Sequence, residues 1–175
     1  MPAQGSDQDN LYQQAAAEYG AALERLARAY EADPEARRDL LQEIHIGLWR
    51  SFEGFEHQCS MRTWIYRVAH NVSASHVLRQ RRSRLQLLVG LEELENMPGL
   101  INGRDAADRN QALERLLKLI QTLKPLDKQV ILSYLEGLDA ASIADITGLS
   151  ASNVATKIHR IKNILARRFQ SGAQR

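Results

Sequence analysis

Apolar residues recur along most of this chain at the three- and four-residue spacings that are typical of amphipathic helices. A first helix is expected over residues 11–30, after about ten polar residues that we expect to be frayed. Asp33 and Pro34 end that helix and begin a second one, which runs to about residue 52, because Asp is a favoured N-cap and Pro is tolerated at the first helical position. The expected core-facing residues of the second helix are Leu41, Ile44, Leu48 and Phe52.

A third helix is expected after a loop over residues 53–59, where Ser60 can cap it. A quarter turn from its apolar stripe, Trp64, Arg67 and Asn71 form a second stripe that offers a flat ring, a cation and an amide. A core does not need this second stripe, so it is a candidate binding surface. The competing interpretation is that the tryptophan packs and the cations are merely solvated. The apolar stripe itself consists of Met61, Ile65, Val68 and Val72.

A cluster of turn-forming residues, Pro98, Gly99, Asn102 and Gly103, marks the expected domain boundary. We divide the chain into an N-terminal helical domain (1–96), a linker (97–110) and a C-terminal domain (111–175). Leu113, Leu116, Leu117, Ile120 and Leu123 predict a helix that ends near Pro125, and residues 127–136 predict another. The predicted fold is all-α, with two small helical domains joined by a linker.

The end of the chain has the layout of a helix-turn-helix. Asp139 begins a short helix, Gly148 can take the positive φ of the turn, and Ser150 can cap the last helix. Val154, Ile158, Ile161 and Leu165 form the apolar stripe of that last helix. The other side carries short polar or basic groups suited to base edges and phosphates, namely Ser152, Thr156, Lys157, His159, Arg160 and Asn163.

The charges of the chain are strongly segregated, although the formal net charge is only +2. Residues 57–91 contain six arginines and no carboxylate, and residues 146–175 contain another six cations and no carboxylate. The rest of the chain contains the remaining 11 basic residues and all 21 acidic ones. Two unopposed basic segments favour a polyanionic partner such as nucleic acid.

Several other classes of protein are disfavoured by the sequence. No apolar run approaches the length of a membrane span, and the first residues lack the pattern of a signal peptide, so we expect no membrane insertion and a cytoplasmic protein. The five histidines are dispersed, and neither a phosphate-binding glycine loop nor a metal-ligand spacing is present. We therefore expect no enzymatic activity, no metal and no cofactor, and we assign the single cysteine, Cys59, no role.

Three segments in this order resemble the bacterial sigma factors of the small, extracytoplasmic-function type in the sigma-70 family. DLLQEIHIGLW (39–49) resembles the helix of that family that binds core RNA polymerase, and MRTWIYRVAHN (61–71) resembles its promoter-melting segment. LKPLDKQVILSYLEGL (123–138), followed by the helix-turn-helix, resembles the domain that binds the minus-thirty-five promoter element. The chain departs from the family at His45 and at Gly47, and a glycine within a helix is expected to cost up to ~1 kcal/mol relative to alanine.

The resemblance implies a transcription initiation factor with core RNA polymerase and promoter DNA as partners, and it allows an anti-sigma factor as a further partner. The implied polymerase contacts are Asp39, Gln42, Glu43, Ile46 and Trp49. The implied contacts to the minus-ten element are Arg62, Trp64, Arg67, Asn71, Arg79, Arg81 and Arg82, and the minus-thirty-five contacts are the six polar and basic residues of the last helix.

A free-standing helix-turn-helix regulator is the alternative function. It would explain the C-terminal domain, but it would leave the helix over residues 39–49 and the stripe over residues 64–71 without a purpose. A sigma factor is expected to bind promoter DNA poorly without polymerase, because its acidic portion repels DNA and leucines within residues 85–94 can fold the two domains together. A regulator would bind its operator alone.

Overall fold

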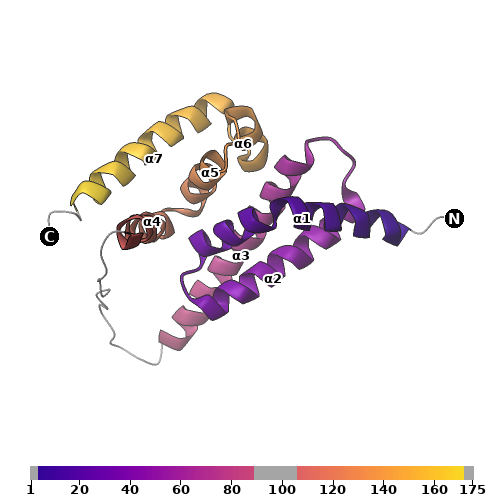
Figure 1. Cartoon of the computed structure of the whole chain (residues 1–175), viewed down its shortest axis with the longest axis horizontal. Coiled ribbons are helices and arrows are strands. Elements are labelled where there is room, and N and C mark those ends of the chain that lie inside the picture. Colours follow the sequence, from indigo (N-terminus) through magenta and orange to yellow (C-terminus); the bar gives the residue numbers. More distant parts are fainter. Residues whose placement is uncertain (1–3, 89–105, 172–175) are drawn as a thin grey trace.

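The structure is a computed structural model that describes residues 4–88 and 106–171, and all regular elements within those ranges are helical. Helices α1 to α3 form the N-terminal half, and α4 to α7 form the C-terminal half (Figure 1). The expected all-α fold is confirmed. The elements are α1 (Gln4–Tyr30), α2 (Pro34–Ser51), the 3-10 turn η1 (Phe52–Gly54), α3 (Met61–Leu88), α4 (Ala106–Gln121), α5 (Pro125–Leu135), α6 (Ala140–Thr147) and α7 (Ala151–Ser171).

Helix α1 is longer than its sequence pattern predicts. It begins at Gln4, so the expectation of a frayed stretch before residue 11 is wrong. A tertiary contact supports these early turns, because the Gln8 side chain donates to the Trp49 carbonyl at 2.7 Å. Asp7 also lies in the first turn, where the helix dipole favours a carboxylate. The periodicity of one helix contains no information about such a contact with another.

The corner between α1 and α2 is built as the sequence predicts. Asp33 Oδ1 accepts hydrogen bonds from the backbone N–H groups of Glu35 at 3.0 Å and Ala36 at 2.9 Å. Pro34 occupies the first position of α2. Two of the four N–H groups that open a helix without intrahelical partners are thus satisfied by one side chain. The predicted cap is confirmed.

Helices α2 and α3 pack against each other at close range. A Cβ atom added at Gly47 would lie 2.9 Å from Val72 Cγ2, which is closer than real Cβ atoms approach other groups. The cost of a glycine within a helix is therefore offset, because an alanine at this position would displace the valine. The core-facing side of α2 is close to the expected one, except that Leu40 is fully buried and the predicted Leu41 is half-buried.

Helix α3 buries a wider surface than its predicted stripe. Ile65 is buried as expected, but Tyr66, Ala69 and His70 are buried beside it, while Val68 is half-buried. The reason is that α3 contacts α5 and α6 of the C-terminal half as well as α1 and α2. The sequence pattern of α3 therefore combines two buried sides, one for each half of the molecule.

The helix-turn-helix is confirmed in each of its local signals. Asp139 accepts a hydrogen bond from the Ser142 N–H at 2.7 Å, and Gly148 adopts φ 76° at the end of α6. Ser150 Oγ accepts from the Asn153 N–H at 3.2 Å and so caps α7. Helix α7 turns the predicted apolar stripe inward, with three of its four residues buried and Ile158 half-buried.

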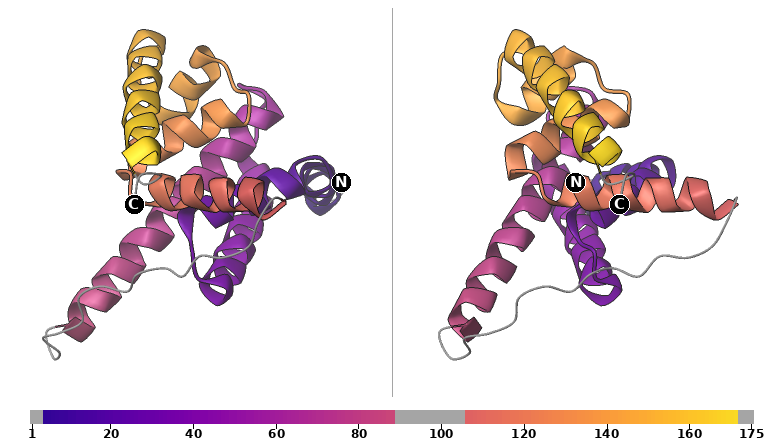
Figure 2. Two further views of the ribbon diagram at one scale, coloured as in Figure 1. Left: turned by 60° about the vertical axis from the view of Figure 1, so that its left-hand side comes forward. Right: turned by 90° about the vertical axis from the view of Figure 1, so that its left-hand side faces the viewer.

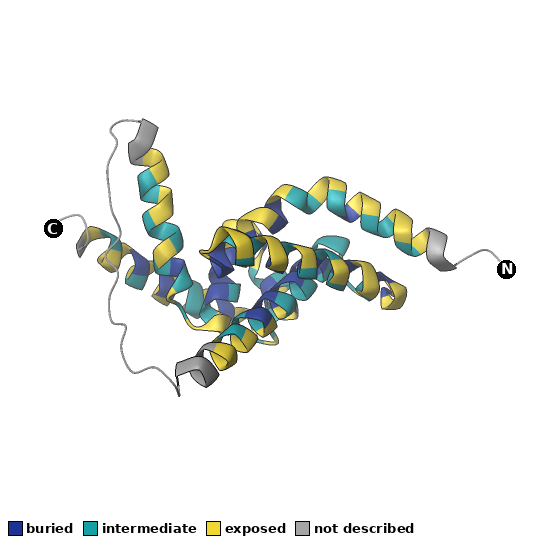
Figure 3. Ribbon diagram, turned by 90° about the horizontal axis from the view of Figure 1, so that it is seen from below, coloured by how far each residue is buried: buried dark blue, intermediate teal, exposed yellow. Residues whose placement is uncertain are grey.

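The two halves pack together into one body, as two views from different sides show (Figure 2). Helix α4 lies against α1, and both α5 and α6 lie against α3. Buried residues gather where helices meet, while the outer faces are exposed (Figure 3). The last turns of α3 project from this body (Figure 2). The side chains of residues 85–94, which the sequence suggested would hold the domains together, lie outside the described residues.

Candidate polymerase and DNA interfaces

The outer face of α2 carries the five residues that the sequence associates with core polymerase. Ile46 and Trp49 keep 43% and 41% of their surface exposed, although both are large and apolar. Asp39 and Gln42 are exposed near them on the same helix, and Glu43 is half-buried. A merely solvated helix face does not require two large apolar side chains, so this face has the composition of a protein interface with an acidic rim.

Glu43 connects this face with the basic part of α3. Its carboxylate pairs with Arg79, and Oε1 lies 3.3 Å from His76 Nδ1. A groove of about 510 Å³ between α2 and α3 is lined by residues of both predicted interfaces, including Glu43, Ile46, Asn71 and Arg79. The residues associated with polymerase and those associated with the minus-ten element are thus adjacent on the surface.

The stripe of Trp64, Arg67 and Asn71 does not form one exposed face. Trp64 is half-buried, its indole N–H donates to Ser51 Oγ at 3.0 Å, and its ring packs on Phe55 with centroids 5.2 Å apart. Asn71 is exposed. Trp64 therefore packs, as the competing interpretation predicted. Asn71 is the residue of this stripe whose polar group is open to solvent.

Two of the predicted DNA-binding arginines contact the C-terminal half. The Arg62 guanidinium donates to the Glu136 carbonyl, and the Arg67 guanidinium donates to the Asp145 carbonyl at 2.7 Å. By contrast, Arg79, Arg81 and Arg82 are exposed on the projecting part of α3. The predicted minus-ten surface is thus divided into a part covered by the C-terminal half and a part open to solvent.

Glu136 is the centre of the contact between the two halves, and sequence reasoning did not select it. Its carboxylate accepts two hydrogen bonds from Arg25, at 2.8 and 2.7 Å, and one from the Tyr66 hydroxyl at 3.2 Å. The Arg25 guanidinium holds the pKa of this carboxyl below its ordinary value. Glu136 follows α5 directly, and no local pattern distinguishes it from any other carboxylate at a helix end.

A buried polar chain crosses the same contact. The Tyr30 hydroxyl lies 3.0 Å from His70 Nδ1, and His70 Nε2 lies 3.1 Å from Ser133 Oγ. All three residues are buried. Burial lowers the pKa of His70 to about 3, so the ring is neutral near pH 7 and one nitrogen donates while the other accepts. This chain joins α1, α3 and α5 through buried side chains.

The outer face of α7 remains open in this packed arrangement. Ser152, Thr156, His159, Arg160 and Asn163 are exposed, whereas Lys157 is half-buried. Lys157 and Arg160 both pair with Asp127 of α5, the latter at 3.5 Å. The predicted recognition face is thus brought together on one helix, with its two cations held toward α5.

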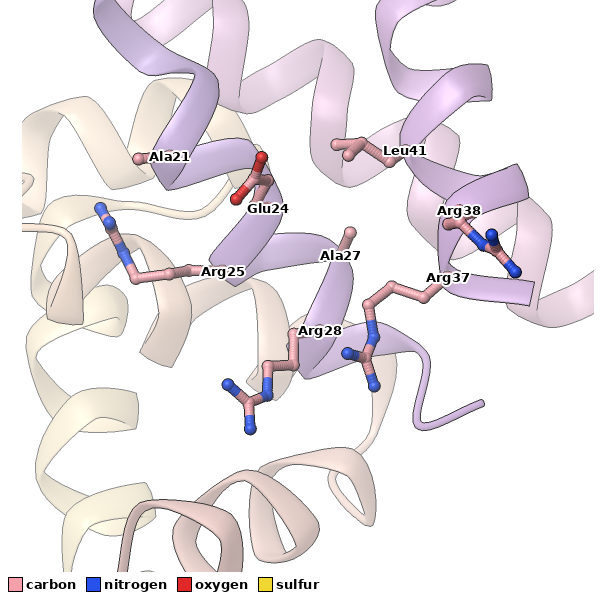
Figure 4. A pocket seen from close by; sticks show the side chains of 8 residues that line it. All are labelled: Ala21, Glu24, Arg25, Ala27, Arg28, Arg37, Arg38 and Leu41. Carbon is pink, nitrogen blue, oxygen red and sulfur yellow. The ribbon is translucent and has the colours of Figure 1, made fainter. Parts of the chain in front are cut away.

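A hollow of about 460 Å³ at the corner of α1 and α2 is lined by four arginines (Figure 4). They are Arg25, Arg28, Arg37 and Arg38. Arg25, Arg28 and Arg38 form ion pairs with Glu136, Glu114 and Glu35, respectively. Arg37 donates to two backbone carbonyls instead. Because these cations are engaged within the chain, the hollow is a weak candidate for binding phosphate.

Within residues 4–88 and 106–171, no group of three or more His, Cys, Asp or Glu side chains is arranged to hold a metal ion. No helix in that part of the chain combines the length and the apolar character needed to cross a bilayer.

Comparison with protein families accounts for both halves of the chain. The model of Sigma-70 region 2 matches residues 15–83, and the model of Sigma-70, region 4 matches residues 113–165. The chain belongs to the sigma-70 family. It is a sigma factor of the extracytoplasmic-function type, which binds core RNA polymerase and directs promoter-specific transcription initiation. A free-standing regulator is not supported, because region 2 accounts for the N-terminal half.

Named relatives agree with this assignment. The RNA polymerase sigma factor CnrH of Cupriavidus metallidurans is 26% identical to this sigma factor, over 90% of this chain and 85% of its own length. The ECF RNA polymerase sigma-E factor of Haemophilus influenzae is 28% identical, over 75% of this chain and 74% of its own length.

Two solved structures share the fold. CnrH in complex with the cytosolic domain of CnrY has a TM-score of 0.67 at 20% identity, covering 96% of this sigma factor and 93% of that chain. The sigma factor RpoE in complex with the anti-sigma factor NepR from Bartonella quintana also has a TM-score of 0.67 at 20% identity, covering 91% and 96%.

Proposed function

We propose that this sigma factor divides its work among three helices. The outer face of α2 binds core polymerase through Trp49 and Ile46, α3 holds the opened minus-ten strand through Asn71 and the arginines near it, and the outer face of α7 reads the minus-thirty-five element. The observation that carries this division is the pair of exposed apolar side chains on α2 beside an α3 rich in arginine. The sigma factor performs no bond chemistry in this scheme and acts in the cytoplasm, where the polymerase is.

The domain limits proposed for this scheme are residues 1–96 for polymerase and minus-ten binding, 97–110 for the linker, and 111–175 for minus-thirty-five binding. An anti-sigma factor is a further proposed partner, since RpoE was solved with one. Such a protein would act by keeping the two domains from their DNA elements.

The packed arrangement is too small to reach both promoter elements at once. A compact chain of 175 residues has a radius of gyration of roughly 16 Å, whereas about 25 base pairs at about 3.4 Å each span roughly 85 Å. Contacts with both elements therefore require the two domains to separate. Separation would also release Arg62 and Arg67 from the carbonyl groups of the C-terminal half.

Run-off transcription with purified core polymerase and genomic promoter DNA tests this function. The wild-type sigma factor should support promoter-specific transcripts, and Asn71→Ala should reduce them on duplex templates while a pre-melted template restores them. An amide can discriminate bases by hydrogen bonding, and its loss should cost about 1 to 3 kcal/mol of discrimination. Permanganate reactivity of minus-ten thymines reports strand opening directly.

Ser75→Ala is the matched control, because Ser75 is exposed one turn further along α3 and lines the same groove. Normal thymine reactivity in a well-folded Asn71→Ala variant would refute the role of α3 in strand opening. Transcription that does not depend on the added sigma factor would refute the function as a whole.

A further inference from the structure

The first turns of α1 lie outside the part of the chain that matches region 2. The match begins at residue 15, yet α1 begins at Gln4 and its early turns run beside the last turns of α2 (Figure 1). Gln8 donates to the Trp49 carbonyl at 2.7 Å, and the Tyr12 hydroxyl lies 3.1 Å from His45 Nδ1. These turns therefore adjoin the face of α2 that we assign to polymerase.

The contact with most consequence in this region is made by Asp9. The indole N–H of Trp49 donates to Asp9 Oδ1 at 2.8 Å, and the tryptophan still keeps 41% of its surface exposed. A carboxylate is a stronger acceptor for an N–H group than a neutral oxygen. The bond fixes one edge of the indole against α1 and leaves other parts of the ring open to a partner.

Such a bond matters most when a side chain must be ordered in a complex. Immobilising a large side chain on binding costs affinity, and a residue that is already held in place avoids part of that cost. Aromatic anchors near the centre of an interface carry much of the binding energy, so the ordering of such a side chain matters for affinity. Trp49 has the composition and exposure of such an anchor, and Asp9 holds it.

We infer that the first turns of α1 belong to the polymerase-binding surface of this sigma factor and that Asp9 is a positioning residue for Trp49. The inference rests on the proposed function, because it takes Trp49 to be a polymerase contact. The partner is core RNA polymerase, at a site with an apolar slot for the indole and Ile46. Asp7 and Asp9 extend the acidic rim that Asp39 and Glu43 begin, so the surroundings of that slot should be basic.

The test measures the affinity of the full chain for core polymerase. Asp9→Ala removes the acceptor and should weaken binding about three- to tenfold, which corresponds to the ordering of one large side chain. Asp9→Asn keeps an oxygen that can accept the indole N–H and should recover at least half of that loss on a logarithmic scale. Glu18→Ala is the matched control, since Glu18 is an exposed carboxylate on the same helix, nine positions away from Asp9 and outside the early turns, and it should change affinity less than twofold.

A double-mutant cycle separates positioning from a structural role. Trp49→Phe keeps an aromatic ring but has no N–H to donate, so Asp9→Ala should have no further effect on polymerase binding in that background. The melting temperature of the free protein should be unchanged by Asp9→Ala, because the side chain is exposed. Circular dichroism should show that α1 keeps its helical content.

Each outcome decides between the possibilities. If Asp9→Ala matches Glu18→Ala, strengthens binding, or weakens it equally in the Trp49→Phe background, the inference is wrong while the proposed function survives. If Trp49→Ala itself leaves polymerase binding unchanged, the assignment of α2 fails, which is a separate result. A loss in Asp9→Ala that is recovered by asparagine and absent with phenylalanine at position 49 supports the inference.

Discussion

The outer faces of α2 and α3 lie side by side, but in the packed chain the first is open to solvent and the second is partly covered. On α2, Ile46 and Trp49 are open to solvent. On α3, Arg62 and Arg67 donate to carbonyl groups of the C-terminal half. The surface suited to a protein is thus available in the free chain, while part of the surface suited to a DNA strand is occupied. The difference favours an order of assembly in which polymerase binds first and DNA second.

Replacing Glu136, the centre of the contact between the two halves, should expose the part of α3 that the C-terminal half covers. Glu136→Arg places a cation against Arg25 and should destabilise the packed arrangement by about 2 kcal/mol. About 1 kcal/mol comes from the screened pair with the exposed Arg25, and about 1 kcal/mol from the hydrogen bond of the buried Tyr66 hydroxyl. Small-angle X-ray scattering should then show a larger radius of gyration, and binding of a single-stranded minus-ten oligonucleotide should increase. Glu35→Arg is the control, because Glu35 pairs with Arg38 within α2. An unchanged radius and unchanged oligonucleotide affinity in Glu136→Arg would contradict the occlusion of α3.

The openness of α2 is tested by Trp49→Ala. If Trp49 becomes buried in the complex, its loss should weaken core binding by about 1 to 3 kcal/mol, and it should leave the packing of the two halves intact. Pull-down with core polymerase gives the affinity, and scattering of the free variant gives its compactness. If both Trp49→Ala and the double variant Trp49→Ala/Glu43→Lys bound core polymerase as tightly as the wild type, polymerase would use another face.

Acid should weaken the packed arrangement through His70. The pKa of His70 is lowered by burial from an ordinary 6.5 to about 3, so its contribution to stability is complete above pH 6.5 and is lost as the pH falls toward 3. At pH 5.5 the free energy of unfolding should be lower by about 1.4 kcal/mol than at pH 7.5. Urea titrations at the two pH values measure this difference.

His70→Asn should remove most of this dependence above pH 5, and the remainder should come from His45, whose pKa is also lowered by burial. The carboxyl of Glu136 has a lowered pKa, so its contribution is present above the ordinary carboxyl range and is lost only at more acidic pH. Retention of the full pH 5.5 effect in a folded His70→Asn variant would assign it to other groups.

The smallest expected effect concerns α7, whose outer face is open like that of α2. Arg168 lies past the predicted base-reading residues and donates to Thr122 Oγ1 at 3.2 Å. If it contacts one phosphate, Arg168→Ala should lower the salt-dependence slope of DNA binding by about 0.9 without changing sequence preference. Selection from random minus-thirty-five sequences measures that preference, and an altered consensus would place Arg168 among the base contacts.

Apart from the first turns of α1, local signals in the sequence were sufficient for the helices and their caps, because the interactions of Asp33, Asp139 and Ser150 lie within a few residues of each. Contacts between distant segments were not predictable in this way. Arg67 and Asp145 are 78 positions apart, and an arginine suited to DNA looks the same in sequence as one that donates to a carbonyl. The packing of Trp64 on Phe55 likewise depends on the turn after α2, which places Phe55 beside the tryptophan ring.

The same limit applies to the candidate site. The polar and basic residues of α7 share a helix face because periodicity alone places them there. Asp9 and Glu136 were not selected, since each acts through a side chain far along the sequence, on Trp49 and on Arg25. Signals for such residues exist only in three dimensions, where a lone carboxylate acquires a specific cation or N–H group.

The close approach at Gly47 has a mechanical consequence. With Val72 in the space that a side chain would otherwise take, α2 and α3 have little freedom to slide past each other. If polymerase binds α2 as proposed, a displacement of α2 should therefore also displace Asn71, the neighbour of Val72. Under the proposed function, we expect the two helices to move as one rigid body, so that the way polymerase holds α2 determines the position of the strand opened on α3.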